Sequence, residues 1–390
     1  RWLKLDNYVG VLETPCGTVL EILPKHTPDT GQPAAIAARR LLVKMLETAL
    51  DLPTRSTDHA DLETYRHPLL EWVMKQFVQA LDTLVKRGLR FDYRRVEEEQ
   101  RFLRGQLDVV KQMRQPPGRD HVFNIRHDLF LPDRLENRLL KSALLRVCKS
   151  TQQPDTWRLS HELAGLLAEI PASQNISTDF HQWRNDRLMA HYQPVRPWCE
   201  LVLGQHMPLA VRGQTRGISL LFPMEKLFER YVEVQLRQQL PAPYRLDAQA
   251  RRHSLCQHDG GDMFELRPDL LLMQDKETCM VLDTKWKLLD GNNRTEKYGL
   301  SQADFYQLFA YGHKYLGGQG EMLLIYPRTA RLPEALPPFD FGHGMQLWVV
   351  PFDLDADQLC LPAGTQCLTS LPFGLQMLPV EQHLAGRTCH

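Results

Sequence analysis

The fold of the C-terminal part of this chain is decided by Arg267-Pro268-Asp269-Leu270 and, a short way on, by Val281-Leu282-Asp283-Thr284-Lys285-Trp286-Lys287. Both stretches place an acidic residue beside an apolar run that is typical of a buried strand. Alternate residues of a strand share a face, so Asp283 and Lys285 are expected to lie side by side. Charged groups at the end of an interior strand are costly unless they have partners or a function. The second stretch therefore predicts a buried strand that ends in a functional site.

The residues between the two stretches predict a β-hairpin. The runs Leu270–Met273 and Thr278–Leu282 have the length and composition of strands, and Gln274-Asp275-Lys276 is a turn. A hairpin places the start of its first strand beside the end of its second, so Asp269 is expected to meet Asp283. The alternative interpretation is that Asp269 caps a turn and that Asp283 forms an exposed ion pair on an edge strand.

Two carboxylates and a lysine in this arrangement suit the hydrolysis of a phosphodiester. Mg²⁺ prefers oxygen ligands and keeps several waters, so Asp269 and Asp283 with a backbone carbonyl would suffice to bind it. Lys285 can orient the attacking water or stabilise the charge of the transition state. The spacing is that of the PD-(D/E)xK motif of metal-dependent nucleases. We therefore expect Asp269, Asp283 and Lys285 to be catalytic, with both aspartates binding Mg²⁺.

Two helices that flank the motif offer further candidates. A helix at about 223–239 has an apolar stripe that leaves Glu225 and Glu229 one turn apart, and either could reach the metal. The alternative for each is a solvated glutamate. On the next helix Gln307 and Tyr311 are spaced i, i+4 and face the same way. This pair is expected to brace the catalytic lysine or to contact DNA, unless Tyr311 packs into the core.

The order of the expected elements predicts a multi-domain α+β protein. Residues 1–60 form a small β-rich region, residues 61–215 a mostly helical middle region, and residues 216–390 an α/β nuclease domain of the PD-(D/E)xK type. Residues 91–112 fit neither helix nor strand clearly, although Gly105 favours a strand. The other expected elements are a hairpin around Pro15-Cys16-Gly17, helices near 41–49, 70–85, 133–148, 158–169, 183–204 and 302–316, and strands near 248–257, 321–326 and 345–350.

Composition limits the classes of function. Lysine plus arginine (47) equals aspartate plus glutamate (47), so the chain has no cationic field of its own to hold nucleic acid. The eight cysteines show no spacing of the kind that binds zinc. No apolar run has the roughly 18 residues of a membrane span, and no signal peptide is evident, so a cytoplasmic protein is expected. A nuclease of this composition needs another molecule to bring it to DNA.

The chain resembles the McrC family, the nuclease subunits of the McrBC modified-cytosine restriction systems. The resemblance covers nearly the whole sequence and assigns the metal-binding and catalytic positions to Asp269, Asp283 and Lys285, with Glu229 as the carboxylate from the helix. It rests on Tyr8–Lys25, Leu135–Leu140, Leu227–Tyr231, Arg267–Lys285 and Asp304–Tyr311.

The resemblance also implies a partner. McrC-like proteins join an McrB-like AAA+ GTPase ring, which recognises double-stranded DNA that contains modified cytosine and binds GTP. The chain itself has no GxxxxGK[ST] phosphate-binding loop. The β-rich N-terminal part is expected to enter the ring and stimulate hydrolysis. The residues assigned to that contact are Tyr8, Val9, Gly10, Glu21, Ile22, Leu23 and Lys25.

Two other functions compete with that of a nuclease subunit that depends on its partner. The chain could organise and stimulate a nucleotide-hydrolysing ring without cutting DNA, or it could be a stand-alone repair or recombination nuclease. Cleavage by the isolated chain would favour the second of these alternatives.

Overall fold

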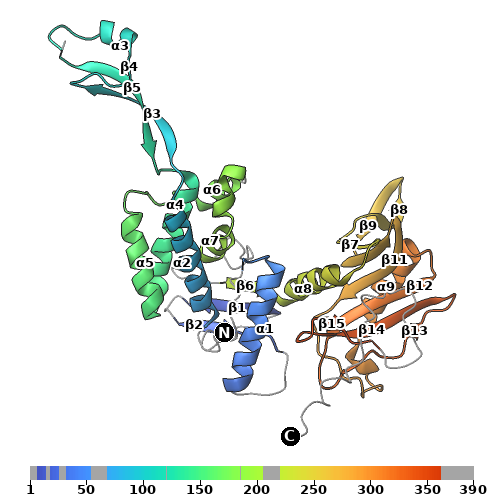
Figure 1. The fold of residues 1–390 in the computed structure, drawn as a ribbon. Helices are drawn as coiled ribbons and strands as arrows, with labels where there is room; N and C mark the ends of the chain where they lie inside the picture. Colours follow the sequence, from blue (N-terminus) through green and yellow to red (C-terminus); the bar gives the residue numbers. More distant parts are fainter. Residues whose placement is uncertain are drawn as a thin grey trace. The chain divides into compact units, whose positions relative to one another are not determined.

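A computed structural model gives the fold of the chain as two compact units (Figure 1). Unit 1 consists of Arg1–Val9, Ile22–Thr54 and Phe222–His390, and unit 2 consists of Gly10–Glu21 and Arg55–Leu221. None of the described helices has the length and hydropathy needed to span a membrane. The structure describes residues 7–14, 18–25, 32–53, 68–119, 121–184, 186–204 and 220–361.

Unit 1 is built on a seven-stranded mixed sheet of order β13-β14-β12-β11-β10-β7, with β15 paired to β14. Strands β11, β12 and β14 are parallel to one another, whereas β10 is antiparallel to both β11 and β7. The strands are β7 (Tyr244–Ala248), β10 (Leu270–Gln274), β11 (Glu277–Thr284), β12 (Gly320–Pro327), β13 (Phe339–Asp340), β14 (Met345–Asp353) and β15 (Gln358–Leu359).

Helices cover the central strands on both faces, which explains their continuous apolar runs. Helix α9 (Gln302–Tyr315) packs on β11 and β12, and its Leu308 joins a buried cluster with Val281 and Leu324. Helix α8 (Met224–Gln239) contacts β7 and β11. The expected strand-rich module with helices at about 223–239 and 302–316 is confirmed by these elements.

The N-terminal helix α1 (Gln32–Ala49) also belongs to unit 1, because it packs on α8. Its Lys44 Nζ donates hydrogen bonds to the Leu354 carbonyl (2.7 Å) and to Asp357 Oδ1 (2.7 Å). The sequence predicts one β-rich region over residues 1–60. In the structure this region is divided, because Gly10–Glu21 belongs to unit 2 and the segment that contains α1 belongs to unit 1.

A hairpin of β8 (His253–His258) and β9 (Gly261–Leu266) separates β7 from β10 in the sequence. Figure 1 shows it extending beyond the end of the main sheet. Most of its residues are exposed, including Phe264. The run expected at 248–257 is therefore divided between β7 of the main sheet and β8 of this hairpin.

Unit 2 contains a helical body. Trp72 of α2 and Trp198 of α7 meet edge to face, with ring centroids 5.1 Å apart. Helix α2 ends before Gly88, whose φ of 98° is readily adopted by glycine. The single helix expected at 183–204 is wrong: it is a 3₁₀ segment followed by α7, because Pro194 interrupts the run, and Pro197 stands in the first turn of α7. The helices are α2 (Leu69–Arg87), α4 (Leu135–Ser150), α5 (Pro154–Leu166), α6 (Ile176–His181), η2 (Arg187–Tyr192) and α7 (Arg196–Val202).

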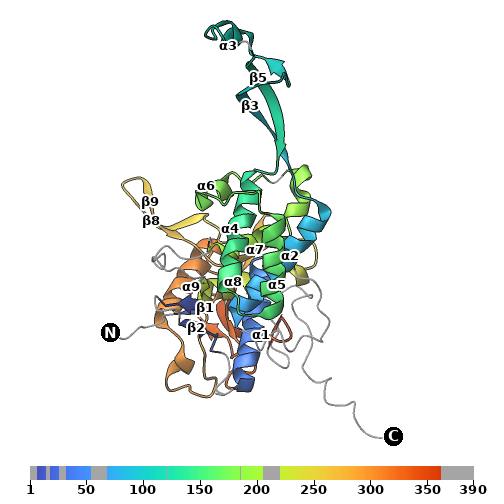
Figure 2. The same cartoon turned by 90° about the vertical axis from the view of Figure 1, so that its left-hand side faces the viewer.

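A long antiparallel ladder interrupts the helices of unit 2, and we call its residues Asp92–Leu131 the arm. Figures 1 and 2 show the arm extending away from the helices that precede and follow it. Its strands pair in a regular register from Asp92↔Leu131 to Gln100↔Phe123. The expectation of a mostly helical middle region is wrong here, and the strand expected near Gly105 is confirmed. The elements are β3 (Asp92–Gln100), β4 (Gln106–Leu107), α3 (Val109–Met113) and β5 (Phe123–Leu131).

A smaller sheet of order β2-β1-β6 contains the N-terminal hairpin. Its strands are β1 (Tyr8–Glu13), β2 (Val19–Ile22) and β6 (Leu220–Pro223). The pairing of β1 with β2 confirms the expected hairpin, whose turn at Pro15-Cys16-Gly17 lies outside the described residues. Gly10 has a φ of 127°, and a Cβ atom there would lie 1.9 Å from the Leu220 carbonyl oxygen. Only glycine fits this close approach.

Candidate active site

The hairpin of β10 and β11 brings the PD and DxK segments together as the sequence predicts. Leu270 pairs with Leu282, so Asp269 and Asp283 lie next to this pair at one end of the hairpin. The backbone amide of Lys285 continues the ladder by donating to the carbonyl of Ile325 on β12 (2.9 Å). The two aspartates and the lysine thus stand where an antiparallel pair and a parallel pair of strands meet.

Asp269 is fixed by the strand opposite it. Its Oδ2 accepts hydrogen bonds from the backbone amide of Thr284 (2.8 Å) and from the Thr284 hydroxyl (2.9 Å). Burial and the nearby Glu229 carboxylate raise the pKa of Asp269, against the opposing effect of the two Thr284 hydrogen bonds. Thr284 therefore orients the first carboxylate of the site.

Asp283 is the most deeply buried carboxylate of the site. It is 1% exposed, and neither of its oxygens has a hydrogen-bond partner among the described residues. Lys285 Nζ lies 2.5 Å from Asp283 Oδ2 as an ion pair, although its direction is poor for a hydrogen bond. Burial and the Asp269 carboxylate raise the pKa of Asp283 to about 7, while Lys285 opposes the rise. A buried acid without hydrogen bonds is costly and suggests that a further ligand completes the site.

Lys285 is held in its charged form by its acidic neighbours. Burial alone would lower its pKa, but the carboxylates of Asp283, Asp269 and Asp304 together raise it. The lysine is 27% exposed at its side chain, so one part of it reaches the surface of the unit. It can act as a fixed cation rather than as a proton acceptor.

Glu229 and Glu225 differ in their surroundings. Glu229 is 8% exposed and accepts hydrogen bonds from Gln249 Nε2 (2.8 Å) and Lys226 Nζ (2.6 Å). Glu225 accepts from Asn7 Nδ2 (3.0 Å) on the exposed surface. Only Glu229 lies close enough to Asp269 to influence its pKa.

Binding of a metal by Asp269, Asp283 and Glu229 stays a prediction. Among the residues that the structure describes, no three His, Cys, Asp or Glu side chains form a group with metal-binding geometry. Glu229 is turned toward Lys226 and Gln249, which satisfy both of its oxygens. A pair of carboxylates fits a divalent cation better: Asp269 and Asp283 are adjacent, and the oxygens of Asp283 are buried and lack hydrogen bonds.

Gln307 and Tyr311 brace a different part of the site from the one expected. The Tyr311 hydroxyl accepts from Gln307 Nε2 (2.6 Å) and donates to the backbone carbonyl of Arg267 (2.9 Å). The pair therefore holds the segment that leads into Asp269, and the expected bracing of Lys285 is not formed. Tyr311 is also 2% exposed, so its ring packs in the core as the alternative interpretation proposed.

Three residues of the site were not assigned from the sequence. Thr284 binds Asp269, and Gln249 binds Glu229 from a left-handed backbone conformation (φ 47°). Asp304 lies in the first turn of α9 and contributes to the raised pKa of Asp283. Its signal in the sequence was its spacing from Gln307 and Tyr311, which places it on the same helical face.

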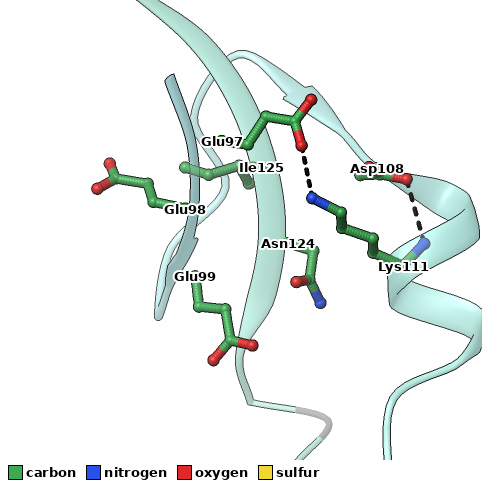
Figure 3. A pocket seen from close by; sticks show the side chains of 7 residues that line it. All are labelled: Glu97, Glu98, Glu99, Asp108, Lys111, Asn124 and Ile125. Carbon is green, nitrogen blue, oxygen red and sulfur yellow. Dashed lines mark hydrogen bonds and ion pairs between the residues drawn. The ribbon is translucent and has the colours of Figure 1, made fainter.

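A separate pocket lies in unit 2 at the end of the arm (Figure 3). Its volume is about 350 Å³, and its lining is mostly charged. Lys111 Nζ lies 2.5 Å from Glu97, and the backbone amide of Lys111 donates to Asp108 Oδ1 (3.1 Å), so these charges hold α3 against the strands. The lining residues are Glu97, Glu98, Glu99, Asp108, Lys111, Asn124 and Ile125.

The residues expected to bind a partner at the N-terminus largely support the fold. Val9 is 3% exposed, and Glu21 Oε1 accepts from the backbone amide of Leu69 (2.9 Å). Gly10 is required for the close approach to Leu220. Tyr8, Ile22 and Leu23 are half-buried, and Lys25 is exposed.

Fold and site together define a mixed α+β protein with a pair of aspartates and a lysine at the end of a buried β-hairpin. The model of a protein family described as the McrBC 5-methylcytosine restriction system component matches residues 3–327. The chain therefore belongs to this family.

Two solved structures from Thermococcus gammatolerans are similar to the chain. The first is a refined half-complex from a tetradecameric assembly of McrB AAA+ hexamers with bound McrC. It is 21% identical, with 89% of this chain and 78% of the matched chain covered, and the TM-score is 0.68, a likeness of fold. The second is the cryo-EM structure of the McrBC complex, 24% identical over 60% of this chain and 67% of the matched chain, and its TM-score of 0.48 supports no argument. No curated protein matches the chain.

Proposed function

We propose that this protein is a Mg²⁺-dependent DNA endonuclease of the PD-(D/E)xK type. The observation that carries the proposal is Asp283, whose two buried oxygens lack hydrogen bonds although Asp269 and Lys285 lie beside it. Such an arrangement is stable when a cation binds between the carboxylates. If Asp283 and Lys285 formed only a structural ion pair, the buried Asp269 would have no role beside them.

The residues of the site have distinct roles in this proposal. Asp269 and Asp283 would hold Mg²⁺, which when bound lowers the pKa of water and offsets charge on the phosphate. Thr284 keeps Asp269 in place, and Tyr311 fixes the backbone before it. Lys285 is a positioned cation that orients the attacking water and stabilises the negative charge of the transition state.

Cutting by this chain is proposed to require an McrB-like AAA+ GTPase ring. The family membership supports this, as does the fold shared with a structure in which McrC is bound to McrB hexamers. In such a complex the ring binds GTP and recognises DNA that contains modified cytosine. The equal numbers of basic and acidic residues in this chain agree with recruitment to DNA by a partner.

The test replaces Asp283 by Asn and measures cleavage of modified DNA by the complex with its ring in Mg²⁺ and GTP. Loss of cleavage with unchanged GTP hydrolysis is expected, since Asn removes the charge and keeps the shape. Asp275→Asn is the matched control, because Asp275 is exposed at the opposite end of the same hairpin. Cleavage retained by D283N would refute the proposal, and cleavage by the wild-type chain without the ring would identify a stand-alone nuclease.

A second function, stimulation of the ring, is favoured by the surface of the arm. Large apolar side chains are exposed along the length of the arm, and exposed apolar surface can mark contact with a partner. The N-terminal residues that the resemblance assigned to this contact include the buried Val9 and the hydrogen-bonded Glu21, and their part in partner binding stays a prediction. The exposed apolar residues of the arm are Tyr93, Phe102, Leu103, Leu107, Val109, Val110, Met113 and Phe130.

The arm can be tested apart from the nuclease site. Replacing Phe102 and Leu103 by Ser should reduce the GTP hydrolysis that this chain stimulates in the ring, because it removes apolar contact area. Leu166 and Leu188 have similar exposure on the helical body, so the same replacement there is the control. Equal stimulation of GTP hydrolysis by all variants would show that Phe102 and Leu103 of the arm do not stimulate the ring.

A further inference from the structure

The segment Trp286–Leu300, which we call the site loop, begins directly after Lys285 and leads into α9. It is closed by backbone hydrogen bonds from Asp290 to the Tyr298 carbonyl (3.2 Å) and from Tyr298 to the Asn293 carbonyl (2.8 Å). Leu289 anchors it in the core at 2% exposure. The loop is therefore a fixed structure at the edge of the candidate active site.

Three consecutive residues of the site loop have left-handed backbone conformations. The φ angles are 54° at Lys297, 59° at Tyr298 and 82° at Gly299. For a lysine and a tyrosine this conformation is strained, and such strain persists where surrounding contacts enforce it, often near functional sites. Tyr298 is held by packing against the core beneath α9, with its ring edge-on to that of Phe339. The adjacent Lys297 is exposed.

The site loop exposes basic side chains that its acidic side chains do not pair with. Of its two acidic groups, Asp290 pairs with Arg331 (3.2 Å), whereas Glu296 is exposed and accepts a hydrogen bond from the neutral Asn293 Nδ2 (3.1 Å). Arg294 and Lys297 are exposed, and their side chains have no ion-pair or hydrogen-bond partner within the described part of the chain. The loop thus carries two exposed cations, and the hydrogen bond from Lys287 Nζ to the Gly299 carbonyl (2.5 Å) ties the end of the loop to a residue two positions after Lys285.

We propose that the site loop binds the phosphate backbone of DNA and guides it to the candidate active site, chiefly through Arg294 and Lys297. This inference rests on the proposed nuclease function. The carboxylates of the site repel a polyanion, and the chain has no net positive charge to compensate. Unpaired cations on a loop that starts directly after Lys285 supply a local attraction for the phosphate backbone on the way to the site.

The test measures binding of a fluorescein-labelled DNA duplex to the full chain with Asp283→Asn, by anisotropy over a range of salt concentrations. The test variant adds Arg294→Ala and Lys297→Asn, since asparagine tolerates the left-handed backbone at that position. Loss of two phosphate contacts should weaken binding roughly ten- to thirty-fold and reduce the slope of log K against log salt by about 1.8. Melting followed by circular dichroism checks that the variants are folded.

The matched control is Arg245→Ala with Lys276→Ala in the same background. Arg245 and Lys276 are exposed near the end of β10 that lies away from Asp269. The affinity for the duplex and the slope of log K against log salt should therefore equal those of the parent variant. An unchanged affinity and slope in the loop variant would overturn the assignment of the loop while leaving the nuclease proposal intact. A parent that binds no duplex would overturn the assignment of the loop alone, because the nuclease proposal leaves recruitment of DNA to the ring, whereas cleavage by D283N bears on the nuclease proposal alone.

Discussion

Replacing Asp283 by Asn should make unit 1 more stable at alkaline pH while abolishing its proposed activity. The pKa of Asp283 is raised from 3.8 to about 7 by burial and by the Asp269 carboxylate. A group whose pKa is raised in the folded state contributes stability that is fully present below its unfolded pKa and is lost as the pH rises through the folded value. The wild-type protein therefore loses stability between about pH 4 and pH 7, and D283N, which cannot ionise, does not.

The size of the effect follows from the pKa difference. At about 1.4 kcal/mol per pH unit, the change from 3.8 to about 7 corresponds to an upper limit of about 4 kcal/mol. Structural relaxation and entry of water reduce this figure, so we expect D283N to be about 2 to 3 kcal/mol more stable at about pH 8. At about pH 3 the two proteins should be nearly equally stable, because Asp283 is then largely protonated in both the folded and the unfolded state.

Hydrogen exchange measured by mass spectrometry on peptides from β10 and β11 provides the assay. Amides that exchange by local opening should exchange roughly thirty-fold or more slowly in D283N than in the wild type at about pH 8, without metal. The reasoning would be refuted if D283N exchanged as fast as the wild type or faster at this pH. A difference of equal size at about pH 4 would contradict it as well, since ionisation would not be its cause.

Asp353 supplies a control of opposite sign on the same sheet. Burial alone would raise its pKa, but the backbone amides of Ala356 and Asp355 and the guanidinium of Arg328 outweigh burial and lower it. Stability from Asp353 is therefore present above its unfolded pKa and is lost in acid. Asp353→Asn should destabilise β14 at about pH 8, where D283N stabilises the hairpin.

Two further predictions concern α9. Asp304→Asn should move the acidic limb of the cleavage pH profile to lower pH, because Asp304 contributes to the raised pKa of Asp283; a profile that does not move would contradict this contact. Tyr311→Phe should lower the free energy of unfolding by about 1 to 2 kcal/mol in denaturant titrations, since it leaves the Arg267 carbonyl without its hydroxyl partner. The exposed Tyr306→Phe should change it by less than about 0.5 kcal/mol, and equal losses from both would show that the buried hydroxyl has no special role.

The hairpin of the site was predictable because its signal is local. Apolar runs of strand length flank a polar turn, and strand periodicity alone places Asp283 beside Lys285. The roles of Gln307 and Tyr311 were not predictable in the same way. Their shared face followed from helical spacing, but the partner of the Tyr311 hydroxyl is the carbonyl of Arg267, and that contact depends on how α9 packs on the sheet.

The hydrogen-bond partners of Glu229 could not be predicted from the sequence either. Its place on α8 near Asp269 agreed with the helical pattern, yet both of its oxygens bind other side chains. One of these partners, Gln249, reaches it from a left-handed residue after β7, a conformation that asparagine or glycine would have signalled and glutamine does not.

The arm could not be derived because its covered face is mostly polar. Ile125 and His127 of β5 are buried and alternate with exposed Arg126 and Asp128, but β3 opposite them carries Glu98, so the sequence shows no regular apolar period of two. Charged pairs such as Arg126 with Glu97 (3.0 Å) replace the usual core between neighbouring strands. Gly105 was the one clear indication, since a Cβ atom there would lie 2.4 Å from the Arg126 carbonyl oxygen.

The assignment of α1 to unit 1 has a consequence for the order of folding during synthesis. Helix α1 ends at Ala49, but its partner α8 begins at Met224, after the whole of the arm and the helical body. At about 5 to 20 residues per second, the ribosome needs roughly ten to thirty-five seconds to produce that interval. During this time the apolar face of α1 has no native partner from α8. Unit 2 can thus complete its fold first, and a fragment that starts at residue 216 would lack a helix that the sheet-bearing unit uses.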